Sequence, residues 1–207
     1  MTRTYMQVFK ILPEFDGSNT YILTEDGKTA VVIDPSEPSI VDELSFRRLE
    51  CKFVLLTHGH FDHVGGCGVL FEKGAHICCG EREKDLIFSK EYLGIFGGVY
   101  VPHFEIARTV SDNEDFEMCG IKFKALATAG HTAGSMCYIA ENALFSGDTL
   151  FCRSIGRTDL PTGDNRAMID SLEKLVRLNG DFNLYCGHGA NSALAFEREN
   201  NPYLRKF

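Results

Sequence analysis

A run of metal-binding residue types placed directly after a short apolar segment is the feature that most constrains this chain. We expect Lys52–Leu56 to be a buried strand, and it leads straight into Thr57-His58-Gly59-His60-Phe61-Asp62-His63. Residues i and i+2 of an extended turn point to the same side, so His58 and His60 can share one ion. Asp62 and His63 point elsewhere and suit a second ion. This spacing predicts a metal site at a strand end.

Three later segments have the same character. They are Gly130-His131-Thr132, Ser146-Gly147-Asp148 and Gly187-His188-Gly189, and each follows a strand-like apolar run. Folds of the α/β type place site residues at such positions. Each segment alone is more often a turn than a ligand. Together with the first run, however, they place five of the seven histidines at glycine-flanked strand ends, which a loop of scattered histidines does not explain.

The apolar periodicity predicts strands mixed with helices. We expect helices at Ile40–Leu49, Val64–Phe71, Arg82–Phe88, Asn165–Leu178 and Ala190–Glu199, and a loop or lid at Glu91–Phe104. Besides Lys52–Leu56, we expect strands at Met6–Leu12, Thr20–Thr24, Thr29–Ile33, Ala75–Cys79, Asp115–Cys119, Ile121–Ala127, Ser135–Ala140, Ala143–Ser146 and Phe182–Cys186, the first three forming an antiparallel meander. The pattern indicates an α/β or α+β fold in which two packed sheets are flanked by helices.

Composition restricts the possible partners. The net charge of −8, without any cluster of Lys or Arg, disfavours nucleic-acid binding. No apolar run reaches the ~18 residues that a membrane span needs, and the start of the chain shows no secretory signal. We therefore expect a cytoplasmic protein that does not enter membranes. The eight cysteines form no CxxC pair and are expected to be reduced.

These motifs, in this order, resemble the full motif set of the metallo-β-lactamase superfamily, from about Tyr21 onward. The nearest branch is the short form of glyoxalase II (hydroxyacylglutathione hydrolase), together with the related persulfide dioxygenases. Ser154-Ile155-Gly156-Arg157-Thr158-Asp159 and Asn201-Pro202-Tyr203-Leu204 carry this narrower likeness. The resemblance implies a four-layer αββα sandwich, with residues 1–207 as a single domain that lacks the C-terminal helical domain of full-length glyoxalase II.

The resemblance also implies a ligand set for two divalent metal ions. It assigns His58, His60, His131 and Asp148 to one ion, and Asp62, His63, His188 and the same bridging Asp148 to the other. Imidazole and carboxylate ligands suit zinc, which we expect, and also iron or manganese. A hydroxide that bridges the ions would be the nucleophile.

Two aspartates have expected roles beside the ions. Asp62 would be catalytic, orienting the hydroxide and handling its proton. Asp34 is either a partner of a ligand histidine or a turn residue before Pro35.

The implied function is hydrolysis of S-2-hydroxyacyl-glutathione or a similar small thioester. Alternatives are a mononuclear iron persulfide dioxygenase and a lactone hydrolase. Arg157, and secondarily Arg153, would contact the thiol carrier, although Asp159 stands where glyoxalase II has an aromatic hydroxyl. Of the two remaining histidines, we expect His76 to lie outside the site. For His103 the sequence leaves two positions open, one in the lining of the pocket and one outside it. The sequence leaves the oligomeric state open.

Overall fold

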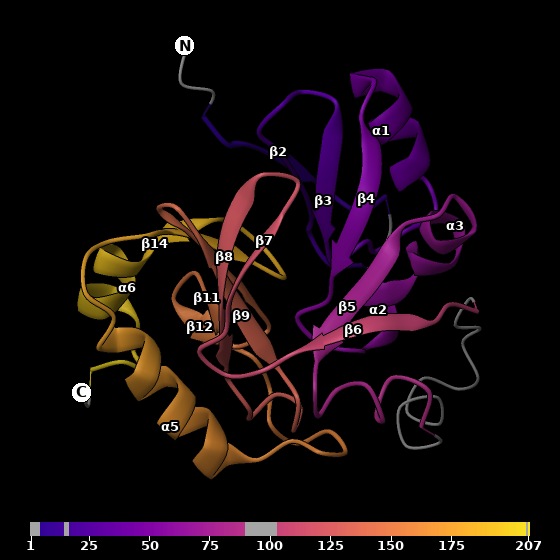
Figure 1. Cartoon of the computed structure of the whole chain (residues 1–207). Coiled ribbons are helices and arrows are strands. Elements are labelled where there is room, and N and C mark those ends of the chain that lie inside the picture. Colours follow the sequence, from indigo (N-terminus) through magenta and orange to yellow (C-terminus); the bar gives the residue numbers. More distant parts are fainter. Residues whose placement is uncertain (1–4, 15–16, 90–102, 206) are drawn as a thin grey trace.

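The computed structural model describes residues 5–14, 17–89, 103–205 and 207. Two six-stranded sheets pack face to face, and helices cover the outer face of each sheet (Figure 1). In the view of Figure 1, α1 and α3 lie outside the first sheet, and α5 and α6 lie outside the second. The expected αββα sandwich is therefore confirmed.

The first sheet is built from the N-terminal half of the chain. Its strands, in spatial and chain order, are β1 (Gln7–Ile11), β2 (Thr20–Thr24), β3 (Thr29–Ile33), β4 (Glu50–Leu55), β5 (His76–Gly80) and β6 (Ile106–Val110). The first three are antiparallel, as the meander predicted, whereas β3 to β6 run parallel. Helix α1 (Ile40–Arg47) connects β3 to β4, and the short helices α2 (Phe61–Val64) and α3 (Cys67–Glu72) connect β4 to β5. The carboxyl ends of these parallel strands therefore all lie at the same end of the sheet.

The second sheet follows the order β14-β13-β10-β9-β8-β7. Its strands are β7 (Asp115–Met118), β8 (Ile121–Ala127), β9 (Met136–Ala140), β10 (Ala143–Gly147), β13 (Asn183–Cys186) and β14 (Ser192–Ala193). Helix α5 (Asn165–Val176) connects the parallel strands β10 and β13, and α6 (Leu194–Asn200) follows β14. The Asp164 carboxylate starts α5 by accepting a hydrogen bond from the Ala167 amide at 2.8 Å. A small hairpin, β11 (Leu150–Phe151) with β12 (Ser154–Ile155), lies between β10 and α5.

Three apolar cores separate the four layers. Alternate residues of each strand point to opposite faces, so Tyr21 and Leu23 of β2 enter the core between the sheets while Ile22 enters the core under α1 and α3. The third core lies between the second sheet and α5, where Met168, Leu172 and Leu175 are at most 1% exposed. Burial of these side chains holds the two sheets in a fixed position relative to each other. The ends of their strands are therefore also held in fixed relative positions.

The structure corrects two predicted helices. The single helix expected at Val64–Phe71 is interrupted at Gly65-Gly66, where the chain passes so close to its neighbour that a Cβ on Gly65 would lie 2.2 Å from the Ser36 carbonyl oxygen. The helix expected at Arg82–Phe88 is wrong, because residues 81–88 form successive turns.

Other differences are additions. Strand β6 and the hairpin β11–β12 were not predicted, and the last helix starts at Leu194 after the short strand β14. Most of the expected loop at Glu91–Phe104 lies outside the described residues.

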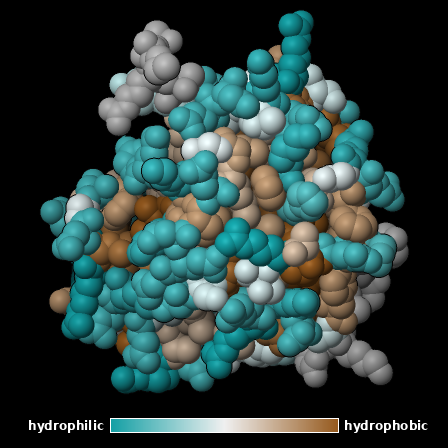
Figure 2. Space-filling model, viewed as in Figure 1, coloured by the Kyte–Doolittle hydropathy of each residue, from teal (hydrophilic) through white to brown (hydrophobic). Residues whose placement is uncertain are grey.

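Hydrophilic side chains cover most of the face shown in Figure 2, with apolar ones in the gaps between them. This is the usual surface of a folded domain. Within the described part of the chain, no helix combines the length and apolar character needed to cross a membrane. All eight cysteines have free thiols.

Candidate metal centre

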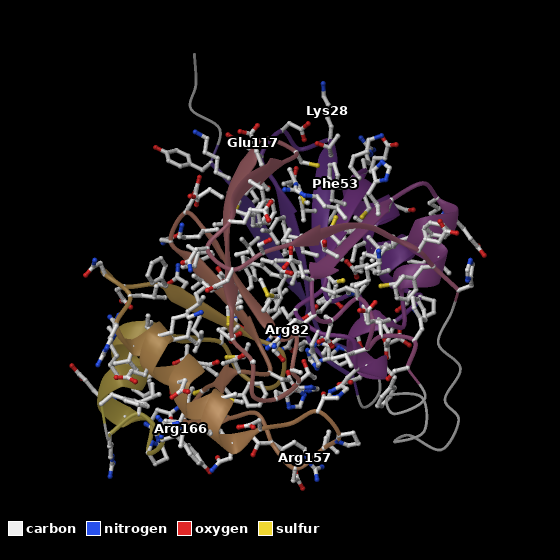
Figure 3. The ribbon with its side chains drawn as sticks, turned by 60° about the horizontal axis from the view of Figure 1, so that its bottom comes forward. Lys28, Phe53, Arg82, Glu117, Arg157 and Arg166 are labelled. Carbon is white, nitrogen blue, oxygen red and sulfur yellow. The ribbon has the colours of Figure 1, made fainter. Side chains whose placement is uncertain are left out.

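Seven polar side chains converge at one end of the sandwich, where strands of both sheets finish. Those that follow β4 are His58, His60, Asp62 and His63, and those of the second sheet follow β8, β10 and β13 and are His131, Asp148 and His188. Figure 3 turns this end forward, with Arg82 near the middle of the view, Arg157 at its lower edge, and Lys28 and Glu117 toward the opposite end. The fold thus brings together all seven residues that the sequence singled out as metal ligands.

Three histidines form the first group. His60 Nδ1 lies 3.1 Å from His58 Nε2 and 2.9 Å from His131 Nε2. All three side chains are buried, and their facing nitrogens lie within 4.8 Å of one another. Three imidazole nitrogens that face a common point are a donor set suited to a transition metal ion.

The second group consists of Asp62, His63 and His188. His188 Nε2 lies 3.1 Å from Asp62 Oδ2, and His63 Nε2 lies 3.7 Å from the same oxygen. The ligand atoms of this group also lie within 4.8 Å of one another. This second set of donors is more exposed than the first, because 39% of the His188 side chain is accessible to solvent.

Asp148 lies between the two groups. Its Oδ2 atom is 3.5 Å from His131 Nε2 in the first group and 3.4 Å from His188 Nε2 in the second. Its Oδ1 atom is 3.4 Å from His63 Nε2, and neither of these two buried atoms has a hydrogen-bond partner among the described residues. Buried polar atoms are nearly always satisfied, so this pair fits a position that a cation fills.

A buried carboxylate next to the groups orients two of their members. Asp34 Oδ2 accepts hydrogen bonds from His63 Nδ1 at 2.9 Å and from the Thr57 hydroxyl at 2.6 Å. The Thr57 oxygen in turn lies 3.1 Å from His58 Nδ1 and is its acceptor. Fixing Nδ1 of both rings as the protonated nitrogen directs Nε2 of His58 and His63 into the site. Asp34 is thus the partner of a ligand-type histidine, one of the two roles that the sequence left open.

The two arginines named from the sequence differ in position. The Arg157 backbone carbonyl lies 2.8 Å from His131 Nδ1 and orients that ring. Its exposed guanidinium forms two hydrogen bonds with Asp159, at 2.7 and 2.8 Å. The Arg153 guanidinium instead lies over the Phe196 ring of α6, 5.2 Å from its centre.

Burial and mutual proximity set the charges of these groups. Burial and the neighbouring imidazoles hold the pKa of His58 well below its usual value and lower the pKa of His60 to about 3. Burial opposes the charge of His63 as well, but the carboxylates around it, Asp148 first, raise its pKa well above the usual value. Burial likewise opposes the charge of Asp148, yet nearby imidazoles, that of His63 first, hold its pKa well below the usual value. The lowered pKa values of His58, His60 and Asp148 favour neutral imidazoles and an ionised carboxylate, the forms that bind metal ions. An ion bound at His63 would instead have to displace a proton from its Nε2 atom.

One glycine is required where the loops meet. A Cβ on Gly187 would lie 2.2 Å from Asp148 Oδ1 and 2.9 Å from His63 Cε1. Only a residue without a side chain fits at this distance. The Gly187-His188-Gly189 segment therefore supplies His188 and, through Gly187, also lets the backbone pass close to Asp148 and His63.

Sequence reasoning missed two buried polar residues that hold the loops in place. Asn19 donates to the carbonyl oxygens of Cys186 and Gly189, at 2.8 and 3.1 Å, and Glu83 accepts from the Gly59 amide at 2.7 Å. Their partners are mostly backbone groups, which leave no residue-type signal in a sequence. The two remaining histidines, His76 and His103, are both exposed, and neither belongs to the metal-type groups found among the described residues.

Comparison with known proteins agrees with this geometry. The family model of the metallo-beta-lactamase superfamily matches residues 13–188. Hydroxyacylglutathione hydrolase GloC of Haemophilus influenzae is 34% identical over 195 residues, covering 90% of this chain and 92% of that protein. The hydroxyacylglutathione hydrolase of Photobacterium profundum is 29% identical over 98% of this chain and 75% of its own length.

Solved structures give the same result. The B3 metallo-beta-lactamase BLEG-1 superposes with a TM-score of 0.87 at 27% identity, covering 97% of this chain and 99% of that one. TTHA1623, solved in a di-iron-bound form, has a TM-score of 0.84 at 29% identity, with 95% and 100% covered. With its two sheets, its converging histidines and aspartates, and these relatives, the chain is a metal-dependent hydrolase that belongs to the metallo-β-lactamase superfamily.

Proposed function

We propose that the protein is a binuclear thioesterase that cleaves S-2-hydroxyacyl-glutathione or a similar thioester of a small thiol. The observation that carries the proposal is the position of Asp148, whose carboxylate lies within 3.5 Å of imidazole nitrogens from both groups. The relatives named hydroxyacylglutathione hydrolase support the substrate class, at 34% and 29% identity.

The two groups support the proposed ligand assignment. His58, His60 and His131, with Asp148, would hold one ion, and Asp62, His63 and His188, with the same Asp148, would hold the other. The buried His63 Nε2 and Asp148 Oδ1 atoms, which lack hydrogen-bond partners among the described residues, fit this assignment. Imidazole and carboxylate donors suit zinc, which we propose, and the di-iron form of TTHA1623 keeps iron as the first alternative. Bound divalent ions would acidify a coordinated water to a pKa of ~7 and polarise a substrate carbonyl.

A side chain of the protein itself would orient the attacking water and accept its proton. Asp62 is the member best placed for this, because 16% of its side chain is exposed and its Oδ2 atom faces His188 at 3.1 Å. From this position its carboxylate can orient a water and accept a proton as the water attacks a carbonyl carbon. The leaving thiolate needs no general acid, because a thiol is far more acidic than an alcohol.

Arg157 is the proposed contact for an anionic thiol carrier such as glutathione. It lies on the segment that orients His131, and its guanidinium is exposed, so a carboxylate ligand could replace Asp159 as its partner. Arg153 is the weaker choice, because its guanidinium packs on Phe196.

Metal analysis followed by substrate assays tests the proposal. Purified protein should contain two ions per chain and hydrolyse S-lactoylglutathione. The same preparation is given glutathione persulfide in an oxygen electrode and, separately, a lactone. One iron per chain with oxygen uptake would identify a persulfide dioxygenase instead, and lactone cleavage without thioester cleavage would identify a lactonase.

A further inference from the structure

A buried carboxylate outside the seven proposed ligands connects two loops of the metal centre. Glu83 lies on the turns of residues 81–88 that follow β5, and its side chain is fully buried. Its Oε1 atom accepts from the Gly59 amide at 2.7 Å, and its Oε2 atom accepts from the Thr132 hydroxyl at 2.9 Å. Burying a carboxylate is costly unless hydrogen bonds compensate for the lost solvation. The two hydrogen bonds are therefore what allows Glu83 to be buried in the folded protein.

The two partners of Glu83 carry the three-histidine group. Gly59 lies between His58 and His60 on the loop after β4, and Thr132 directly follows His131 on the loop after β8. Because β4 and β8 belong to different sheets, the carboxylate joins the two sheets at the point where the three imidazoles meet.

Packing leaves little freedom at this junction. A Cβ on Gly134 would lie 2.4 Å from both the backbone nitrogen and Oε2 of Glu83, and a Cβ on Gly59 would lie 2.4 Å from Ile87 Cγ1. Thr132 is held from its other side by Ser135, whose hydroxyl oxygen lies 2.8 Å away. A displacement of the carboxylate would therefore move both histidine loops.

The second group is held by different residues. The Ser18 hydroxyl donates to the Asp62 carbonyl oxygen at 2.9 Å, and the Asn19 amide donates to the carbonyl oxygens of Cys186 and Gly189, on either side of His188. No hydrogen bond found among the described residues connects Glu83 to Asp62, His63 or His188. Asp148 contacts members of both groups, and Asp34 reaches both, directly and through Thr57, but the backbone of the two sets of loops is thus held by separate buried side chains.

We propose that Glu83 is a positioning residue for the three-histidine ion alone, and that Asn19 has the corresponding role for the other ion. The proposal rests on the ligand assignment given under the proposed function and does not depend on the thioester substrate. Loss of Glu83 should weaken binding of the first ion by about 10- to 100-fold, the usual effect of removing an outer partner of a metal site.

Variants that keep only one of the two proposed ion positions allow each position to be studied by itself. His188→Ala removes a ligand of the second group only, and His131→Ala removes one of the first group only. Metal-free proteins are titrated with Co²⁺, followed by visible absorption, and with Zn²⁺ against a chelating indicator. In the His188→Ala background, Glu83→Ala should lower the affinity by about 10- to 100-fold. In the His131→Ala background, its effect should stay within about threefold. Asn19→Ala should give the reverse pattern.

A conservative variant distinguishes positioning from general destabilisation. The amide oxygen of Glu83→Gln can still accept from Gly59, so this variant should retain more affinity for Co²⁺ than Glu83→Ala, with urea unfolding of the metal-free proteins as the control for stability. Equal losses in both backgrounds, or no loss in the His188→Ala background, would overturn the proposal. If two ions bind as assigned but S-lactoylglutathione is not cleaved, the proposed substrate fails while the role of Glu83 stands.

Discussion

The Nδ1 atom of His63 lies 2.9 Å from Oδ2 of Asp34, and both side chains are buried. The same carboxylate also accepts a hydrogen bond from the backbone amide of Thr57 at 2.8 Å. It therefore connects the end of β3 to the start of the segment of residues 57–63.

Asp34→Asn tests this relationship. Asparagine tolerates the positive φ of 50° at this position, but it cannot accept every hydrogen bond that the carboxylate accepts. Metal affinity should fall by about 10- to 100-fold, and unfolding free energy should fall by about 1–3 kcal/mol. Chelator competition and urea unfolding of the metal-free protein measure the two effects. Unchanged metal affinity would show that His63 does not need this partner.

Asp148→Ala tests the bridging role. Because this carboxylate lies between the two groups, its loss should abolish retention of both ions, whereas His188→Ala should abolish retention of only one. Metal content after gel filtration measures both. The effect of Asp148→Ala should exceed the roughly 10- to 100-fold cost of losing an outer partner. Activity surviving in Asp148→Ala would contradict the bridging assignment.

Gly187→Ala and Gly189→Ala form a matched pair. The first would place a methyl group 2.2 Å from Asp148 Oδ1, whereas nothing lies within 4 Å of the corresponding position at Gly189. Gly187→Ala should therefore lose metal ions and activity. Gly189→Ala should keep both and lose only ~1 kcal/mol of stability, because of its positive φ. Elemental analysis and thermal unfolding compare them, and equal metal content in the two variants would refute the close-approach argument.

Asp26→Asn tests a pH effect far from the metal centre. In the turn between β2 and β3, hydrogen bonds from the backbone amides of Thr29 and Lys28 lower the pKa of Asp26 to about 2. Because the folded-state pKa lies below the unfolded one, this carboxylate stabilises the protein fully above pH ~4, and its contribution is lost as the pH falls toward 2. Asp26 is exposed, so solvent screening limits its contribution, and Asp26→Asn should cost no more than about 1 kcal/mol at pH 7.

Urea unfolding at pH 7 and at pH 3 measures the difference between Asp26→Asn and the parent protein. The difference should shrink at the lower pH, and a constant difference would exclude ionisation as its cause. Because Asp26 is remote from the seven proposed ligands, the variant should also keep full metal content, which makes it the control for Asp34→Asn.

Much of the site could be predicted because its side chains are chemically specific. His58 and His60 flank a glycine after a buried strand, and few other functions require that spacing. Most strands of both sheets were predicted for a similar reason, since alternating or continuous apolar runs such as Thr20–Thr24 have few alternatives, whereas β6 and β14 were missed.

The remainder depends on contacts that no local pattern encodes. The break in the predicted helix at Gly65-Gly66 arises from the approach of Ser36, about 30 positions earlier in the sequence. Glu83 lies in a polar stretch that has helical character by composition, and its inward orientation is determined by the Gly59 amide and the Thr132 hydroxyl on other elements. Partners of this kind become visible only once the chain is folded.

Each proposed ion has two ligands from one sheet and two from the other, a consequence of strand ends that meet across the sandwich. Ion release and separation of the two halves are then coupled equilibria, in which either event makes the other easier. Neither half alone carries a complete set of donors. Uptake of metal by this chain would therefore report that its N-terminal and C-terminal portions have docked, in addition to preparing it for chemistry.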